Sequence, residues 1–217
     1  MQIKKSFASG CSYDIRSMVA IFMKILLTGS LLLIFLQMTP LLAEQKGSIG
    51  NFGQVSENVY RGQRLDEESD FKELADLGVQ TVISLERFHS EDPELCKEYG
   101  LHCVRFPLIL LGLTDADKFF DYSIFQKAFQ FLVDEEHQGR KVYIHCFYGK
   151  DRTGALSAAF TIRKNACGKE EYNKDELWQK VDGDLQAYGF HNDLYPTLKG
   201  NIRSWVYELP SWICQGD

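Results

Sequence analysis

The chain has 217 residues, of which 45% are hydrophobic, and its formal net charge is −6. A chain of this length can bury one full core and hardly two, so we expect one folded domain. The acidic balance excludes a general electrostatic attraction to nucleic acid or to anionic membranes. An anionic substrate would therefore need a local basic pocket.

The N-terminal segment is predicted to be a secretory signal. Lys24 precedes a run of 12 mostly apolar residues, 25–36, and the small residue Ala43 follows at a suitable cleavage point. A run of this length is typical of the apolar region of a signal peptide and is shorter than the ~20 residues that span a bilayer. We therefore expect residues 1–43 to be a signal peptide and upstream leader.

The true translation start would then be Met18 or Met23. The alternative is an uncleaved membrane anchor that reaches back to Val19, although Lys24 interrupts that longer run. Cleavage would remove four of the 24 basic and one of the 30 acidic residues, leaving 20 against 29 and a net charge of −9. Residues 44–217 would form a periplasmic or secreted domain, with no membrane attachment after cleavage.

Between residues 58 and 107 the sequence predicts strands that alternate with helices. The first helix shows Phe71 and Leu74 on one face and ends at Gly78, and the second begins at Asp92 and ends at Gly100. The expected strands are residues 58–61, 79–85 and 101–107, and the expected helices are residues 66–77 and 92–100.

The second half of the chain continues the same alternation. A long helix over residues 121–137 is followed by a β-branched and aromatic strand at residues 141–145. Three further helices are expected, one from Ala155, one from Asn173 with Glu176 completing a capping box, and one carrying the apolar stripe of residues 198–209. This order predicts an α/β fold in which helices flank a largely parallel central sheet.

Residues 145–154, His-Cys-Phe-Tyr-Gly-Lys-Asp-Arg-Thr-Gly, connect the expected catalytic strand to a helix. Successive backbone N–H groups in such a turn, with the positive end of the helix, form a concave anion site. The same field favours the thiolate of Cys146, which could act as the nucleophile. Arg152 could hold two phosphate oxygens at once. The Thr153 hydroxyl could donate to the sulfur and make Cys146 a better leaving group.

The residues between the cysteine and the arginine are expected to bind the phosphate. They are Phe147, Tyr148, Gly149, Lys150 and Asp151. Lys150 could extend phosphate recognition, or it could be a solvated loop lysine. Asp151 could orient a leaving group or the attacking water, or it could be a structural ion-pair partner of Arg152.

The alternatives for Cys146 are a buried structural cysteine and a zinc ligand, and both explain fewer residues of this segment than a phosphate site does. Neither role explains Arg152, and the sequence has no second Cys/His pair with zinc spacing. A nucleotide-binding loop of the Walker type fails because Asp151 replaces the required Ser or Thr after Lys150. The chemistry of the segment requires no metal and no other cofactor.

The His-Cys-x5-Arg-Thr motif resembles the signature of the protein tyrosine phosphatase superfamily. Its place in the C-terminal half resembles the compact dual-specificity-like branch, which includes exported bacterial tyrosine phosphatases and cysteine-type phytases. Low-molecular-weight phosphatases and arsenate reductases carry the loop near the N-terminus, and rhodaneses usually have a shorter loop. The resemblance covers about residues 50–217, including Asn51-Phe52, residues 59–63 and residues 78–85. It implies a dual-specificity phosphatase-like fold and a cysteinyl-phosphate intermediate.

The resemblance also implies a general acid, an aspartate on a separate loop that protonates the leaving group. Residues 110–118 are the corresponding segment. Alignment of residues 125–132 with the family helix that follows this loop places Asp115 at the acid position, and Asp117 is the alternative. Asp121 is more simply a helix N-cap.

Inositol polyphosphates and phosphotyrosine-type proteins are both expected substrates. Several cations near the loop favour the inositol polyphosphates slightly, because each added phosphate could meet a fixed charge. In this family the pocket wall could include Arg61, Gln63, Arg87 and Arg163. The alternatives in other classes are a phosphate-binding pseudophosphatase and rhodanese-like or arsenate reductase-like thiol chemistry. The oligomeric state is not predicted.

Five cysteines follow residue 43, which is an odd number. Four of them could form two disulfides in an oxidising compartment and leave Cys146 free. Three pairings are possible. Proximity in the sequence favours Cys96–Cys103 together with Cys167–Cys214.

Overall fold

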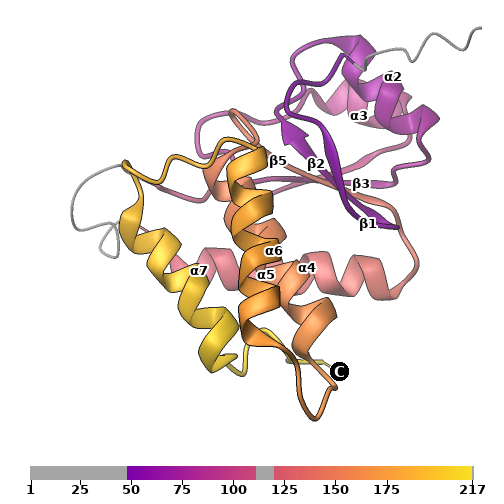
Figure 1. The fold of residues 1–217 in the computed structure, drawn as a ribbon. Helices are drawn as coiled ribbons and strands as arrows, with labels where there is room; N and C mark the ends of the chain where they lie inside the picture. Colours follow the sequence, from indigo (N-terminus) through magenta and orange to yellow (C-terminus); the bar gives the residue numbers. More distant parts are fainter. Residues whose placement is uncertain (1–47, 111–119, 217) are drawn as a thin grey trace, which may run out of the picture. The chain divides into compact units, whose positions relative to one another are not determined.

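The computed structural model describes residues 48–110 and 120–216. Within these residues the strands form one five-stranded sheet in the order β1-β2-β5-β3-β4 (Figure 1). Strand β1 pairs antiparallel with β2, and the other four strands are parallel. The strands are β1 (Gly53–Ser56), β2 (Val59–Gln63), β3 (Thr81–Ser84), β4 (His102–Arg105) and β5 (Val142–Cys146). The prediction of an α/β fold with a largely parallel sheet is confirmed.

Helices cover both faces of the sheet (Figure 1). On one face lie α2 (Glu68–Asp76) and α3 (Pro93–Glu98), and on the other lie α4 (Tyr122–His137), α5 (Asp151–Ala166), α6 (Lys174–Ala187) and α7 (Pro196–Glu208). Side chains of β5 alternate between the two cores. Val142 and Ile144 pack in the larger core with α4 to α7, and Tyr143 packs in the smaller core with α2.

Side-chain caps and glycines set the ends of several helices. The carboxylates of Asp92 and Asp121 accept hydrogen bonds from the first backbone N–H groups of α3 and α4, and Asn173 does the same for α6. Gly78 and Gly100 follow α2 and α3 with positive φ angles of 77° and 66°. The expected helix ends and the capping role of Asp121 are therefore confirmed.

Two local features differ from the sequence-based expectation. Residues 53–56 form the edge strand β1, which was not predicted because the pairing is short and irregular and its side chains do not alternate between buried and exposed. Helix α5 begins at Asp151 rather than at Ala155, so Arg152 lies in its first turn.

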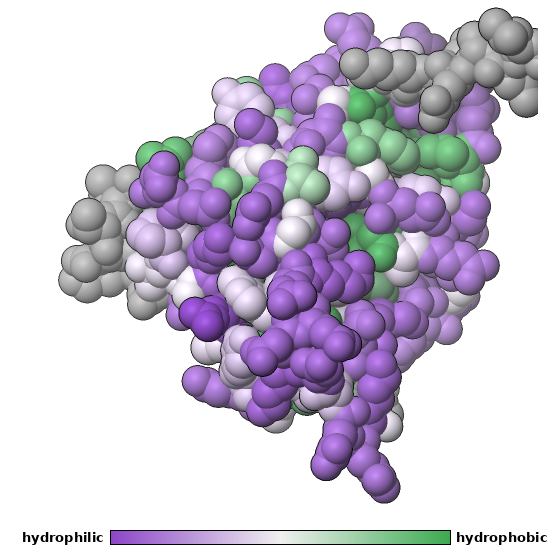
Figure 2. Space-filling model, viewed as in Figure 1, coloured by the Kyte–Doolittle hydropathy of each residue, from purple (hydrophilic) through white to green (hydrophobic). Residues whose placement is uncertain are grey.

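None of the helices in the described ranges has the length and apolar character needed to cross a bilayer. The face shown in Figure 2 is mostly hydrophilic.

Two disulfides join elements of the domain. Cys96 of α3 is bonded to Cys103 of β4, and Cys167 at the end of α5 is bonded to Cys214 near the C-terminus. The favoured pairing is thus the one that the structure contains. Cys146 is the free cysteine of the described chain.

Candidate active site

The segment between β5 and α5 forms a tight loop around the end of the central strand. Cys146 is the last residue of β5, and α5 begins five residues later at Asp151. Gly149 has a φ of 67° and packs against the backbone of Gly62 in β2. A Cβ at this position would collide with the Gly62 carbonyl group, so both the backbone angle and the close approach require glycine here.

The carbonyl groups of this loop are held from behind by residues far away in the sequence. Arg61 of β2 donates from Nη2 to the Gly149 carbonyl oxygen at 2.7 Å. Asn51 donates from Nδ2 to the carbonyl oxygens of Tyr148 and Gly149, each at 3.1 Å. A planar trans peptide directs its N–H opposite to its C=O. These bonds therefore favour an arrangement in which the loop amides face the cysteine side, as an anion site requires.

Cys146 opens into a cavity of about 310 Å³ at the C-terminal edge of the sheet. Five of the predicted loop residues line it: Cys146, Phe147, Tyr148, Asp151 and Arg152. The rest of the lining comes from the segments after β3 and β4 and from the start of α7, namely residues 86–88, residues 108–110 and Tyr195. Cys146 keeps only 3% of its surface exposed, so its thiol lies at the bottom of this cavity.

Arg152 is fixed by acceptors on the neighbouring strand ends. Its Nη1 donates to the Leu85 carbonyl oxygen at 2.9 Å and lies 3.6 Å from Oε2 of Glu86. These contacts hold one side of the guanidinium group against the protein, and the side chain stays partly exposed in the cavity. A guanidinium group in this position can offer its remaining N–H groups to an oxyanion.

Two other polar residues of the loop motif, His145 and Thr153, are buried. His145 is fully buried, and its Nε2 lies 2.7 Å from Oε1 of Glu91. Burial alone would raise the pKa of Glu91, but the imidazole of His145 outweighs burial and holds this pKa below its ordinary value. Thr153 is also fully buried, and its hydroxyl makes no hydrogen bond with the described residues. Its donation to the sulfur stays a prediction.

The structure pairs Asp151 with a residue that the sequence did not indicate. Its Oδ1 accepts a hydrogen bond from the backbone N–H of His191 at 2.8 Å, and its Oδ2 lies 2.9 Å from Nδ1 of the same residue. The partner of Asp151 is therefore His191 and not Arg152. Lys150 does not line the cavity, and its Nζ lies 5.8 Å from the centre of the Tyr148 ring.

The expected basic wall of the cavity is only partly present. Arg87 lines the cavity, whereas Gln63 does not. Arg61 is buried behind the loop, because its strand position directs the side chain towards α5 and α6. Arg163 is buried at the other end of α5, where it donates to the Ile213 carbonyl oxygen, about 18 Å along the helix axis from the first turn. The placement of Arg61 and Arg163 in the wall was wrong.

Three polar or aromatic residues of the cavity lining were not predicted from the sequence. Glu86 faces Arg152, Phe88 lies at the rim with 90% of its surface exposed, and Tyr195 lies at the start of α7. Burial raises the pKa of Tyr195, and so does the charge of Asp151, while Arg152 opposes the shift. No motif marks these positions, since a lone aromatic or acidic residue after a strand is common on any surface.

The two candidates for the general acid, Asp115 and Asp117, lie outside the described residues. Leu110 is the last described residue before them, and it lines the cavity.

A free cysteine at the end of a central parallel strand, with an arginine in the first turn of the following helix, is the strand–loop–helix arrangement that the sequence motif predicts. The sequence model of the tyrosine phosphatase family matches residues 48–164, which is more than half of the chain. The chain belongs to this family.

One curated relative and two solved structures illustrate this similarity. The dual specificity protein phosphatase PHS1 of Arabidopsis thaliana is 25% identical over 131 residues. That match covers 58% of this chain but only 12% of PHS1, so the chain spans a small part of that relative. TpbA of P. aeruginosa in complex with pTyr has 22% identity and a TM-score of 0.56, covering 76% of this chain and 91% of TpbA.

The core catalytic domain of the PP-IP phosphatase SIW14 from S. cerevisiae, in complex with citrate, is also similar. It has 16% identity and a TM-score of 0.51, and the match covers 75% of this chain and 87% of that domain. At these identities the two solved structures support the fold.

Proposed function

We propose that this phosphatase hydrolyses phosphate monoesters through a cysteinyl-phosphate on Cys146. The Cys146 thiolate attacks phosphorus, the bond from phosphorus to the ester oxygen breaks, and that oxygen leaves with a proton from the general acid. Water then attacks the cysteinyl-phosphate, which releases inorganic phosphate and restores the thiolate. The observation that carries this proposal is the free Cys146 at the bottom of a cavity that Arg152 also lines.

Electrostatic stabilisation would supply most of the acceleration in both steps. The loop amides and Arg152 surround the position where the equatorial phosphate oxygens would lie, and they keep this arrangement throughout the reaction. Arg152 is suited to the role because Leu85 and Glu86 already hold its guanidinium group in place. The pseudophosphatase alternative loses support, since the nucleophile and the arginine are both present and face one cavity.

We further propose phosphotyrosine-type proteins as the substrate class. The mouth of the cavity carries three exposed aromatic side chains, Phe88, Phe147 and Tyr148, which are 90%, 38% and 58% exposed. Exposed aromatic groups around a pocket favour a flat aromatic leaving group and its peptide. A polyanionic substrate loses support, because Arg61 and Arg163 are buried elsewhere. SIW14 is a PP-IP phosphatase and TpbA is seen with pTyr, so the shared fold is compatible with either class.

A direct comparison of substrates tests both proposals. Residues 44–217 would be assayed on phosphotyrosine peptides and on inositol hexakisphosphate without added metal, with Cys146→Ser as the inactive control. Phe88→Ala should raise KM for the peptides more than for a small aryl phosphate, and Leu194→Ala, an exposed apolar side chain outside the cavity lining, serves as the control. Efficient hydrolysis of inositol hexakisphosphate with inert peptides would reverse the substrate assignment.

We also propose that the domain is exported. Two disulfides link four of the cysteines that follow residue 43, and such bonds persist in oxidising compartments. The fifth, Cys146, is buried without a second free thiol among the described residues, which suits a nucleophile that must stay reduced there. Fractionation of cells that express the full chain would test this: the mature domain should leave the cytoplasm with residues 1–43 removed.

A further inference from the structure

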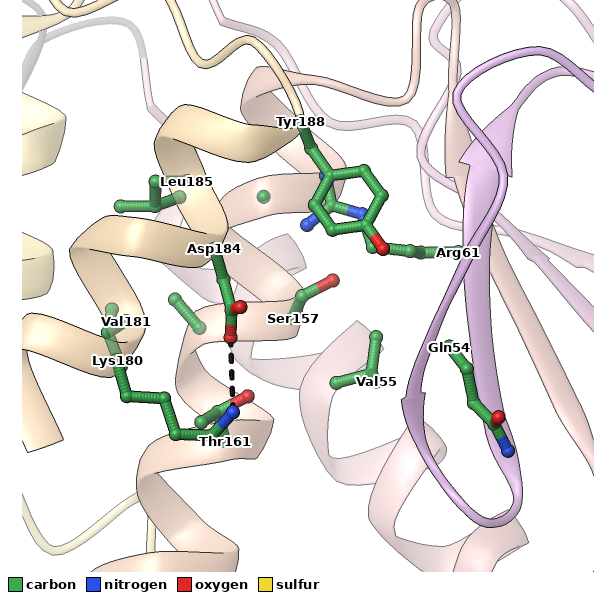
Figure 3. A pocket seen from close by; sticks show the side chains of 12 residues that line it. Gln54, Val55, Arg61, Ser157, Thr161, Lys180, Val181, Asp184, Leu185 and Tyr188 are labelled. Carbon is green, nitrogen blue, oxygen red and sulfur yellow. Dashed lines mark hydrogen bonds and ion pairs between the residues drawn. The ribbon is translucent and has the colours of Figure 1, made fainter.

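A second cavity lies behind the phosphate-binding loop, between α5, α6 and the β1–β2 hairpin (Figure 3). Among the described residues it shares no lining residue with the catalytic cavity, and its volume is about 70 Å³. A cavity needs about 10–15 Å³ of this kind of space to hold one water molecule, so there is room for a group of several atoms. The polar side chains that line it include Arg61, Ser157, Thr161 and Tyr188.

Arg61 brings a buried positive charge to this cavity. Only 2% of its surface is exposed, and no carboxylate of the described residues lies within ion-pair distance of it. Its Nη2 donates a hydrogen bond to the Gly149 carbonyl oxygen, and the centre of the Tyr188 ring lies 4.0 Å from its Cζ. Its Nε has no hydrogen-bond partner among the described residues. Burial lowers the pKa of Arg61 to about 10, against the opposing effect of Tyr188 and the more distant charges. A buried N–H of a charged group that lacks an acceptor is costly.

Ser157 supplies a second unsatisfied group from the opposite wall. It lies on α5, only 5% of its surface is exposed, and its Oγ makes no hydrogen bond with the described residues. In Figure 3 its hydroxyl points towards the side of the cavity where Arg61 and Tyr188 lie. At the exposed mouth, Lys180 and Asp184 pair with each other at 3.4 Å, so their charges offset one another. The cavity is therefore net positive and has two donors without acceptors.

We propose that this cavity binds a small oxyanion, a carboxylate or phosphate group, which accepts hydrogen bonds from Nε of Arg61 and Oγ of Ser157. An anion here compensates the buried guanidinium charge and satisfies both donors at once. The same arginine holds the Gly149 carbonyl of the catalytic loop. The oxyanion therefore acts on the catalytic site from behind, as an effector that does not compete with substrate. This second consequence rests on the proposed hydrolysis at Cys146, whereas the binding does not.

Binding can be measured without turnover. The Arg152→Ala protein lacks the guanidinium group that would bind phosphate in the catalytic cavity. Calorimetric titrations of this protein with acetate and with inorganic phosphate would show which oxyanion binds in the second cavity, which lies behind the loop. Crystals of the same protein soaked in that anion should show it between Arg61 and Ser157. Ser157→Ala should weaken the binding about tenfold or more, as expected for a hydrogen bond to a charged group. Ser204→Ala, which removes a hydroxyl bonded within α7, should leave the binding unchanged.

Kinetics test the coupling between the two cavities. With wild-type protein and an aryl phosphate, the bound oxyanion should lower kcat as well as raise apparent KM, and in Ser157→Ala only the competitive effect on KM should remain. A coupling in the common range would change kcat about fivefold or more. The proposed site would be wrong if the soaked crystals showed only water between Arg61 and Ser157 and if Arg152→Ala protein bound the anion equally well with and without the added Ser157→Ala change. Purely competitive inhibition of both proteins would overturn the coupling. An inactive enzyme that still binds the anion would instead contradict the proposed function.

Discussion

Asp151 receives the backbone N–H of His191 at Oδ1 and faces its ring Nδ1 at Oδ2, at 2.8 and 2.9 Å. The two residues are 40 positions apart, so the pair ties the first residue of α5 to the turn that follows α6. A carboxylate at this end of a helix is also stabilised by the helix dipole. The start of α5, and with it the position of Arg152, is therefore set by a contact outside the catalytic motif.

Replacement of Asp151 should affect stability. Asp151→Ala removes a mostly buried carboxylate that accepts a charge-assisted hydrogen bond from the His191 backbone, so the free energy of unfolding should fall by about 1.5–3 kcal/mol. His191→Ala should cost less, because the backbone N–H remains. Urea denaturation of both variants would measure this, with the exposed Asp193→Ala as control. Loss of turnover in Asp151→Ala at unchanged stability would mean that Asp151 acts directly on the substrate or on water.

Cys146 is predicted to be essential for turnover. Cys146→Ser should abolish hydrolysis and still bind vanadate, because the loop amides and Arg152 remain while the thiolate is lost. The wild-type enzyme should keep its activity in EDTA. Phosphate release and vanadate titration would measure these effects. Full activity of Cys146→Ser, or loss of activity on chelation, would contradict the mechanism.

The sequence was sufficient to predict the order of the described strands and helices, apart from β1, and the strand–loop–helix segment that carries Cys146 and Arg152. Local signals carry that information: apolar periodicity, the caps Asp92, Asp121 and Asn173, and the glycines that end α2 and α3. The loop motif is also local, because Cys146 and Arg152 are joined by one short turn. These features therefore did not depend on knowing which strands are neighbours.

The residues that support the loop from behind could not be predicted. Arg61 reaches Gly149 only because β2 lies beside β5, with Arg61 opposite Ile144 in the register. Asn51 contacts Tyr148 across 97 positions of the chain. A basic residue in a strand can point to either face, and the face follows from pairing between strands rather than from any motif. The same uncertainty led to the incorrect placement of Arg61 in the wall of the catalytic cavity.

The buried pair of Glu91 and His145 predicts how stability depends on pH. The pKa of Glu91 lies below its ordinary value of 4.5 in the folded protein. The unfolded chain therefore takes up the proton first, and the stability that Glu91 contributes is present above about pH 4.5 and is lost as the pH falls through the folded value. The difference in unfolding free energy between wild type and Glu91→Gln should shrink on acidification.

Urea unfolding between about pH 3 and pH 7 would measure this difference. Glu57→Gln, an exposed change on the β1–β2 turn, is the control. A difference that grows on acidification would mean that Glu91 is destabilised as a charged group in the folded state, contrary to the contact with His145.

The two disulfides should contribute unequally to stability. Cys167–Cys214 closes a loop with a sequence separation of 47 and Cys96–Cys103 one of 7. Each disulfide lowers the conformational entropy of the unfolded chain, which should raise the free energy of unfolding by about 4 kcal/mol for the longer loop and by about 2 kcal/mol for the shorter one. Replacing each pair by alanines and measuring unfolding would test the order. Thiol titration of the natively exported protein in denaturant should give one free thiol, and five would reject both bonds.

Replacement of the general acid should slow hydrolysis to an extent that depends on the leaving group of the substrate. Asp115→Asn should slow the hydrolysis of esters with poor leaving groups by about 10²–10⁴, because only these need a proton in the transition state, and it should spare activated aryl phosphates. Asp117→Asn is the matched comparison in the same segment, and Asp121→Asn should leave the rates unchanged because Asp121 caps α4. A plot of log kcat against leaving-group pKa for each variant would identify the acid by its steeper slope. If neither Asp115 nor Asp117 steepens that slope, the proton comes from another group at the cavity, and Asp151 and Tyr195, which both line it, would be the next residues to test.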